Sequence, residues 1–378
     1  MYSRYSGTAE QRGIISYGVK GAIVKSQGLK VRDGNEKDLN QILSLRKVVF
    51  GEMEKDKLDP EFWKWEFMEG PNGRALIYIV EEGGRVIGHF SDIPRKFSFN
   101  GKVVLGTLSL DLMVHPNYRR RGLFEEMGRY AAQCVTAANG LFMTAYPIRE
   151  ETIHGLKKIG WKGIVELPVL VYPIRFWGIF DRYLHFRPLS TLLGGVARFF
   201  FFLFFQYKVR AKKGEGIDID QIDQLDDEFD RFWERVFSLY PIMGVRDRSF
   251  LNWRYFQHPT RTYTIYRAMN RGEMRGYLIL RKVDLLDFNS AVIVDLLALD
   301  KETLKALVAR SIEHSYKEGT ALLGFMVPKT HPYYRDLRHW GFLPSLKTFQ
   351  FMVYPTVEEK RLLNPEVWYV NWGDTDVI

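Results

Sequence analysis

The sequence predicts a mixed α/β fold built from two copies of one unit, and three observations support this prediction. The two halves of the chain repeat the same residues at a nearly constant offset. Within each half, runs with the two-residue apolar period of a strand alternate with runs that have the helical period. A strand also leads into a long helix through a basic turn around Gly122. We therefore expect each copy to form a mixed twisted sheet flanked by helices.

The repeat is clearest around Trp65 and Trp253, which lie 188 residues apart. Further along, Asp111 matches Asp295 at an offset of 184, as a small deletion would produce. The pairs at the offset of 188 are Asp59 and Asp247, Phe62 and Phe250, Trp65 and Trp253, Pro71 and Pro259, Ile77 and Ile265, Tyr78 and Tyr266, and Gly88 and Gly276. We expect an extension over residues 1–28, a first domain over 29–174, a hydrophobic helical linker over 175–213 and a degenerate second domain over 214–378.

Each element of the first copy follows from its apolar period and its flanking residues. Asn35 is placed to cap the first helix, because acidic residues follow it in the first turn. Gly83 and Gly84 are typical of a hairpin turn. In chain order we predict a strand at residues 29–32, helices at 36–49 and 60–68, strands at 76–81 and 86–97, the strand that carries Asp111, a helix at 123–138, a strand at 141–146, a helix at 150–159 and a strand at 164–172.

The turn between Pro116 and the helix at 123–138 is suited to an anionic ligand. A strand that enters a helix through a glycine turn leaves backbone N–H groups at the positive end of the helix, where they bind phosphate oxygens. Three consecutive arginines beside Gly122 add charged donors. The turn lacks the Gly-Lys-Ser/Thr ending of a P-loop and the three glycines of a dinucleotide-binding turn.

The same segment resembles the acyl-CoA loop of the GNAT N-acyltransferase superfamily. Its run Arg119-Arg120-Arg121-Gly122-Leu123-Phe124 follows the pattern Arg-x-x-Gly-x-Gly/Ala except at Phe124, and the run from Asp111 to Tyr118 resembles that family's fourth strand. The resemblance implies tandem GNAT-like domains and acetyl-CoA or another acyl-CoA as co-substrate. It implies that the cofactor-binding residues are Met113, Val114, Arg119, Arg120, Arg121, Gly122, Leu123 and Phe124.

The second copy lacks this loop. After Asp295 the chain passes through Asp300 directly into Lys301-Glu302-Thr303-Leu304, without a glycine or an arginine cluster. We therefore expect only the first copy to bind the cofactor. Because Asp295 persists without the loop, its counterpart Asp111 has either a structural or a catalytic role.

The catalytic base is not fixed by the resemblance. The tyrosine and the glutamate that the family often uses correspond here to Leu156 and Leu110. We consider His154, Asp111 and His89 as catalytic candidates, since histidine titrates near neutral pH. No metal site is expected, and the single cysteine, Cys134, excludes a cysteine-rich one.

Composition restricts the class of protein. The net charge of +9 is concentrated at the arginine turn and in residues 208–213, and no nucleic-acid-binding signature accompanies it. The first residues lack the apolar stretch of a secretory signal, so we expect a cytoplasmic protein. The apolar run at 199–205 is predicted to be buried in the protein or in a homodimer interface. Peripheral membrane contact through residues 189–213 is the alternative.

Three functions remain open. The first is an N-acyltransferase that uses an acyl-CoA, with acetyl-CoA favoured, and acts by direct transfer on a primary amine of a small molecule, an amino sugar or a peptide. The second is a Fem-type aminoacyl or peptidyl transferase, which is also built from tandem GNAT-like halves. The third is a non-catalytic protein that binds acyl-CoA for regulation or as a scaffold.

Overall fold

The computed structural model describes residues 29–51, 55–176, 179, 181, 187–201, 203–204 and 216–376. The first half of the chain contains β1 (Val31–Asp33), α1 (Leu39–Phe50), α2 (Pro60–Met68), β2 (Leu76–Glu82), β3 (Arg85–Phe99), β4 (Lys102–Val114), α3 (Leu123–Ala137), β5 (Phe142–Ala145), α4 (Glu150–Lys158) and β6 (Lys162–Pro173). These elements confirm the predicted order, and the bounds of α2 agree with the prediction.

The second half repeats this order after the helix α6 (Arg187–Phe201). Its elements are β7 (Ile217–Ile222), α8 (Glu228–Val236), β8 (Ile242–Gly244), α9 (Arg248–Leu251), β9 (Thr264–Asn270), β10 (Glu273–Leu285), β11 (Phe288–Ala298), α10 (Lys301–Lys317), β12 (Leu322–Met326), α11 (Pro332–His339), β13 (Leu343–Pro355) and β14 (Trp368–Tyr369). The predicted mixed α/β fold is therefore confirmed in both halves.

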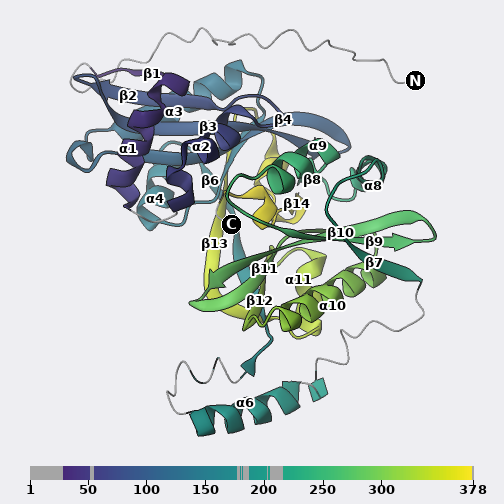
Figure 1. Cartoon of the computed structure of the whole chain (residues 1–378). Helices are drawn as coiled ribbons and strands as arrows, with labels where there is room; N and C mark the ends of the chain where they lie inside the picture. The colour runs from purple at the N-terminus through teal and green to yellow at the C-terminus, as the bar shows by residue number, and fades with distance from the viewer. Residues whose placement is uncertain are drawn as a thin grey trace, which may run out of the picture.

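The two halves share one continuous sheet. In this sheet the last strand of each half pairs with a strand of the other half. The strand order is β1-β2-β3-β4-β5-β13-β6-β12-β11-β10-β9-β7. The last strand of the first half, β6, pairs with β12, while the last strand of the second half, β13, pairs with β5. Figure 1 shows β6 and β13 side by side at the centre of the molecule. The repeat alone predicted two similar sheets and gave no sign of this exchange.

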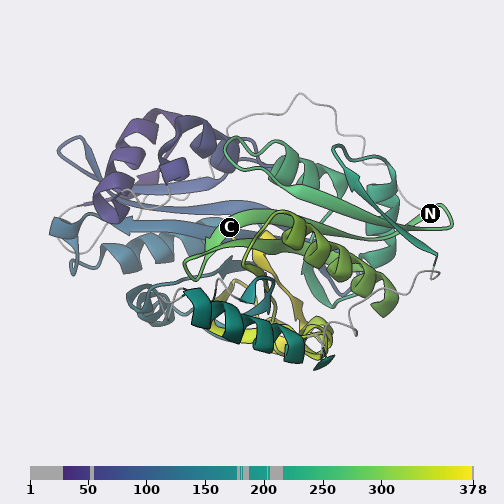
Figure 2. The same cartoon turned by 60° about the horizontal axis from the view of Figure 1, so that its bottom comes forward.

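Helices cover both faces of the sheet because the strands are apolar on both sides. In β2, Ile77 and Ile79 pack in the core cluster that includes α1 and α2, whereas Tyr78 and Val80 pack in the cluster that includes α3. In the second half, α10 packs on β10 and β11, as Figure 2 shows from below. The parallel β4–β5 and β11–β12 pairs are reached through crossover helices on these faces.

The local signals in the sequence act as predicted. The Asn35 side chain accepts a hydrogen bond from the Lys37 N–H, and Asp38 completes a capping box that begins the helical segment. Asp59 caps α2 and its repeat partner Asp247 caps α9. Gly83 and Gly84 both adopt positive φ, at 55° and 75°, in the hairpin turn between β2 and β3.

The repeated tryptophans meet across the boundary between the halves. The indole Nε1 of Trp65 donates to the Trp253 carbonyl at 2.9 Å, and the Trp253 Nε1 donates to the Trp65 carbonyl at 3.1 Å. Their rings are stacked, with centroids 4.8 Å apart. Because each residue makes the contact that the other makes, the two copies are related here by a local twofold arrangement.

Trp65→Ala is expected to lower the free energy of unfolding by about 3–5 kcal/mol, since it leaves a cavity and removes the hydrogen bond that the Trp65 indole donates to the Trp253 carbonyl. Urea denaturation of the full chain measures this change. The control is Tyr316→Ala, because Tyr316 is 54% exposed and its loss should change stability by less than about 0.5 kcal/mol. A similar loss in both variants would contradict the central role of the tryptophan pair.

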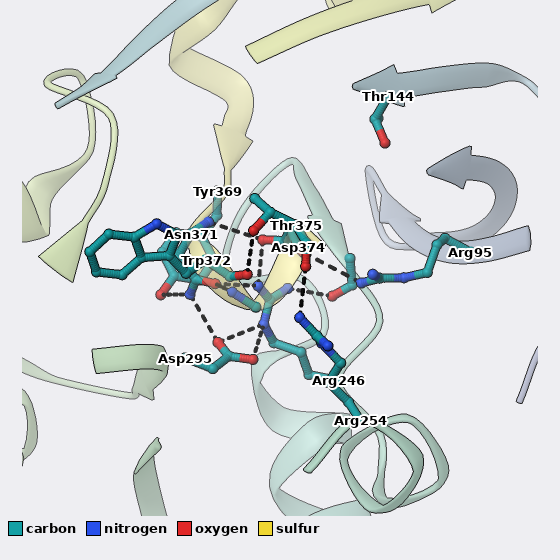
Figure 3. A network of polar contacts seen from close by, with 12 residues as sticks. Arg95, Thr144, Arg246, Arg254, Asp295, Tyr369, Asn371, Trp372, Asp374 and Thr375 are labelled. Atoms are coloured by element: carbon teal, nitrogen blue, oxygen red, sulfur yellow. Dashed lines mark hydrogen bonds and ion pairs between the residues drawn. The ribbon is translucent and has the colours of Figure 1, made fainter. Parts of the chain in front are cut away.

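The end of the chain is inserted between the halves. The segment from Asn371 to Thr375 is buried, and Asp374 accepts a hydrogen bond from Arg246 at 2.7 Å and pairs with Arg95 at 3.5 Å (Figure 3). Arg246 also pairs with Asp295 at 3.0 Å. Arg95 lies on β3 of the first half and Asp295 on β11 of the second, so this segment joins both halves at their boundary.

The predicted burial of residues 199–205 inside the protein is wrong for most of the described residues. Phe201 is buried against Tyr172 and Phe176, with ring centroids at 5.0 and 5.2 Å. Phe199 and Phe204 are each 59% exposed. Only one side of the helical segment faces the fold, and Phe202 and Phe205 lie outside the described residues. In the part of the chain that the structure describes, every helix falls short of the length and apolarity needed to cross a membrane.

Candidate active site

The basic turn between β4 and α3 is exposed and has a left-handed backbone at two residues. Arg120 has a φ of 63°, and Gly122, the N-cap of α3, has a φ of 81°. A Cβ atom at Gly122 would meet nothing within 4 Å, so the space beside the turn is open. The first α-helical hydrogen bond runs from the Glu126 N–H to the Gly122 carbonyl. The three N–H groups before it are available to an anion at the positive end of the helix.

The side chains around the turn leave its backbone accessible. Arg119 donates to the Val114 carbonyl at 3.4 Å, and the Arg121 guanidinium lies 4.9 Å from the Tyr118 ring centroid. The side chain of Leu123, the first residue of α3, is buried. Phe124, which stands where the pattern has a small residue, packs on α4. A Cβ atom on Gly155 of α4 would lie only 2.6 Å from the Phe124 ring. The large side chain is therefore directed to α4 and not to the turn.

β4 separates from β5 after Leu108, in the middle of the strand. Thr107 and Leu108 pair with β5, and β4 then continues to Val114 with no strand on that side among the described residues. Asp111 has a φ of 54°, and the register with β3 shifts between His89 and Ser91, which marks a β-bulge. The backbone of Met113 and Val114 therefore lies on the edge of β4 that has no partner strand among the described residues. Met113 is buried and Val114 is half-buried.

Two buried groups hold the bulge in place. An Arg46 nitrogen on α1 lies 2.5 Å from Asp111 Oδ1, and both side chains are almost fully buried. His89 Nδ1 lies 2.8 Å from the Asp111 carbonyl oxygen. Burial raises the pKa of Asp111, but the positive charges of Arg46 and Lys57 outweigh this and lower it to about 2. Asp111 is thus ionised and held by arginine, which suits a structural residue better than a proton acceptor.

A second buried ion pair, which includes a residue of the C-terminal segment, lies next to the pair of Arg46 and Asp111. Lys57 Nζ lies 2.7 Å from Asp376 Oδ2, and the Lys57 side chain is 3% exposed. Its positive charge lowers the pKa of Asp376, although burial alone would raise it. Residues separated by more than 300 positions in the chain therefore meet beside the bulge.

Glu66 on α2 lies in the middle of this cluster. Its carboxyl is buried, and burial, aided by the charges of Asp111 and Asp376, raises its pKa to about 7, whereas Lys57 and Arg46 oppose this rise. Glu66 borders a small cavity with room for roughly one water molecule. The other residues that line this cavity are Trp65, Ile93, Arg95, Leu108, Trp253, Arg254, Thr375 and Asp376. A buried carboxyl that titrates near neutral pH is a suitable general base.

The raised pKa of Glu66 predicts a pH-dependent stability. Because the folded state binds the proton more tightly than the unfolded state, this stabilisation is complete below about pH 4.5 and is lost as the pH rises through about 7. Glu66→Gln removes the effect, so its stability relative to wild type should increase by up to about 3 kcal/mol between pH 4.5 and pH 8. Denaturation at both pH values measures this difference. The control is Glu69→Gln, at the exposed end of the same helix. A constant difference between Glu66→Gln and wild type would contradict the assigned pKa.

The structure separates the predicted catalytic candidates. Asp111 and His89 meet at the bulge, and burial lowers the pKa of His89, so its neutral ring positions the backbone. His154 lies on the exposed side of α4, where its Nδ1 is 2.8 Å from the Glu150 carbonyl oxygen of the same helix. Nothing in the described structure joins it to the bulge. Cys134 is buried, and burial raises its pKa to about 12, which fits an inert thiol.

Glu66, Arg46, Lys57 and Asp376 were missed in the sequence. One signal could have revealed Glu66, because it is the only acidic residue inside the run Phe62-Trp63-Lys64-Trp65-Glu66-Phe67 and its repeat position holds Arg254. The carboxylate therefore belongs only to the copy that has the basic turn. The pairs between Arg46 and Asp111 and between Lys57 and Asp376 join distant segments, and no local pattern predicts them.

The second copy keeps the buried aspartate but not the anion site. Asp295 pairs with Arg246, accepts a hydrogen bond from Asn371 at 2.9 Å and lies 3.2 Å from the Tyr255 hydroxyl. At the start of α10, the Asp300 side chain caps the helix by accepting from the Thr303 N–H at 2.7 Å. A carboxylate thus occupies the helix end that would meet a phosphate. Among the described residues, no group of three His, Cys, Asp or Glu side chains could hold a metal ion.

The comparisons with known proteins agree with this geometry. Residues 30–163 match the family model of the acetyltransferase (GNAT) domain. No curated protein matches the chain in sequence.

Solved structures of three proteins share the fold. A GCN5-related N-acetyltransferase from Anabaena variabilis is 12% identical, with a TM-score of 0.62 over 87% of this chain and 73% of that chain. A GCN5-related N-acetyltransferase from Kribbella flavida is 15% identical, with a TM-score of 0.58 over 88% of this chain and 72% of that chain. Saccharomyces cerevisiae N-myristoyltransferase with bound myristoyl-CoA is 11% identical, with a TM-score of 0.54 over 87% and 79%. At these identities the likeness shows a common fold across both halves.

Proposed function

Residues 30–163 belong to the GNAT acetyltransferase family, and from this premise we propose that the chain transfers an acyl group from acyl-CoA to a primary amine. The observation that carries the proposal is the open turn at Gly122, which follows a bulged and unpaired edge of β4 and occurs in one half only. A small-molecule, amino-sugar or peptide amine is the acceptor class.

The residues of the first half fit an acyl-CoA. The N–H groups at the start of α3 and the side chains of Arg119, Arg120 and Arg121 would hold its phosphates. The backbone of Met113 and Val114 would hold the pantetheine arm along the free edge of β4. When bound, acyl-CoA supplies a thioester whose carbonyl accepts the amine.

The polar cluster would complete the reaction. Glu66 accepts a proton from the amine nitrogen as the carbon–nitrogen bond forms, through the one water for which its cavity has room. The carbon–sulfur bond then breaks, and the thiolate leaves and takes up a proton from solvent water. Arg46 and His89 hold Asp111 and thereby fix the backbone on which the thioester would lie.

We propose acetyl-CoA as the donor, because the family model that matches residues 30–163 describes an acetyltransferase domain.

Turnover of acetyl-CoA against a panel of amines tests the function. We expect release of free CoA that depends on one class of amine, together with an acetylated product in the mass spectrum. Tetradecanoyl-CoA should give at most about one tenth of that rate, because each buried methylene it adds must find space in a packed core. Tight binding of acetyl-CoA without turnover on any amine would instead support the non-catalytic reading.

A further inference from the structure

We propose that helix α6 binds the surface of a lipid bilayer that contains anionic lipids, with its axis parallel to that surface. The proposal does not depend on the acyltransferase function. It rests on three features: an apolar stripe that faces away from the fold, the length of the helix, and the charge of the surrounding chain.

The apolar stripe has the spacing of a single helix face. Leu189, Leu192, Val196 and Phe199 of α6 lie at intervals of three, four and three residues, which places them in one row. Leu192 is 64% exposed and Phe199 is 59% exposed. The full stripe of exposed residues is Leu189, Leu192, Leu193, Val196, Phe199, Phe200, Leu203 and Phe204. So many adjacent apolar side chains form a larger patch than a monomeric soluble protein normally exposes.

The opposite side of α6 is attached to the fold. Phe201 is buried and its ring packs on Tyr172 of β6 and on Phe176. Figure 1 shows α6 apart from the helices that cover the sheet, at the lower end of the molecule. The attachment through Phe201 therefore directs the stripe outward. Gly195 leaves a shallow apolar hollow between Leu192, Val196 and Phe199, which suits a lipid acyl chain.

The length of α6 indicates that it lies on a membrane and does not cross it. Its 15 residues extend for about 22 Å, which is less than the roughly 30 Å of a hydrocarbon core. Arg198 is exposed and, by helical spacing, lies opposite the stripe. An exposed cation on the far face of an apolar stripe is typical of a helix at the membrane interface.

The positive charge of the chain around α6 favours an anionic bilayer as the partner of this helix over a second copy of the chain. Residues 182–213 contain Arg182, Arg187, Arg198, Lys208, Arg210, Lys212 and Lys213 and no aspartate or glutamate. A second copy has the same excess of positive charge in this part of its sequence, which opposes pairing of two copies through α6. An anionic lipid surface attracts them.

Sedimentation of the full chain with lipid vesicles tests the proposal. We expect at least tenfold more binding to phosphatidylcholine vesicles that contain about one third phosphatidylserine than to pure phosphatidylcholine, and weaker binding at roughly 0.5 M salt. The double variant Leu192→Asp/Phe199→Asp should lose at least nine tenths of the binding. The control Leu346→Asp alters a fully exposed leucine of β13 and should bind as wild type does.

Two further measurements show whether a loss of vesicle binding comes from misfolding or from a change of oligomeric state. Acetyl-CoA affinity and circular dichroism show whether the double variant is folded, since the stripe lies outside the core. Light scattering gives the mass of each variant. Equal vesicle binding by wild type and the double variant would overturn the proposal, because it would show attraction by net charge alone. A wild-type dimer that binds no vesicles, and that the double variant splits, would overturn it in favour of a contact between copies.

Discussion

Glu66→Gln is expected to lower kcat for acetyl transfer by about 10²–10⁴-fold, while acetyl-CoA affinity stays within about twofold of wild type. Glutamine keeps the size of the side chain but cannot accept a proton. The cofactor contacts that we propose lie on β4 and α3, whereas Glu66 lies on α2, so binding should be spared. Steady-state kinetics with the acceptor found in the amine panel, together with calorimetry, measure both quantities.

The pH profile distinguishes a base from a structural residue. Because the pKa of Glu66 is raised to about 7, the wild-type rate should increase as the pH passes through about 7, when the carboxyl loses its proton. Glu66→Gln should lose this rise, and Glu66→Asp should keep part of it. The control Glu69→Gln should match wild type. A Glu66→Gln variant with a full rate and an unchanged profile would remove Glu66 from the mechanism.

Gly122→Asp is expected to weaken acetyl-CoA binding by several kcal/mol, which corresponds to at least about a thousandfold. The new carboxylate would stand at the N-terminus of α3, where we place the pyrophosphate, and it would repel that group. The change also forces a side chain onto a backbone with a φ of 81°.

Gly101→Asp provides the matched control for this loss. Gly101 has a φ of 73° in the turn between β3 and β4, and a Cβ atom there also meets nothing within 4 Å. The control carries the same strain and the same charge away from α3. Calorimetry should therefore show nearly wild-type affinity for Gly101→Asp. Equal losses in both variants would assign the effect to backbone strain and would reject the proposed phosphate site.

The sequence was sufficient to predict the elements whose signals are local. The bounds of α2, the cap at Asn35 and the turn at Gly83 follow from residues that are close together in the chain. The basic turn was also predicted, because an anion site at a helix N-terminus depends on a short run of residues. The reciprocal contact of Trp65 and Trp253 joins two positions that the repeat had already paired.

Features that depend on distant contacts could not be predicted in this way. The exchange of β6 and β13 leaves the apolar period of each strand unchanged, so nothing local reveals which strand lies beside it. The role of Glu66 depends on Lys57 and Asp376, which meet only in the folded chain. The prediction that residues 199–205 are buried in the protein or in a homodimer interface followed from their apolarity. Within the chain, only one side of α6 packs on the fold, so the first alternative is wrong for most of the described residues and the second stays a prediction.

The number of acetyl-CoA molecules bound per chain tests the central claim most directly. We expect one, because the turn at Gly122 is open to a phosphate whereas the Asp300 side chain caps the corresponding helix of the second half. Isothermal titration of the full chain with acetyl-CoA, at a protein concentration well above the dissociation constant, gives this number. A stoichiometry of one that disappears in Gly122→Asp is the predicted result. A stoichiometry of two, or of one that survives in Gly122→Asp, would contradict the assignment of the site to the first half.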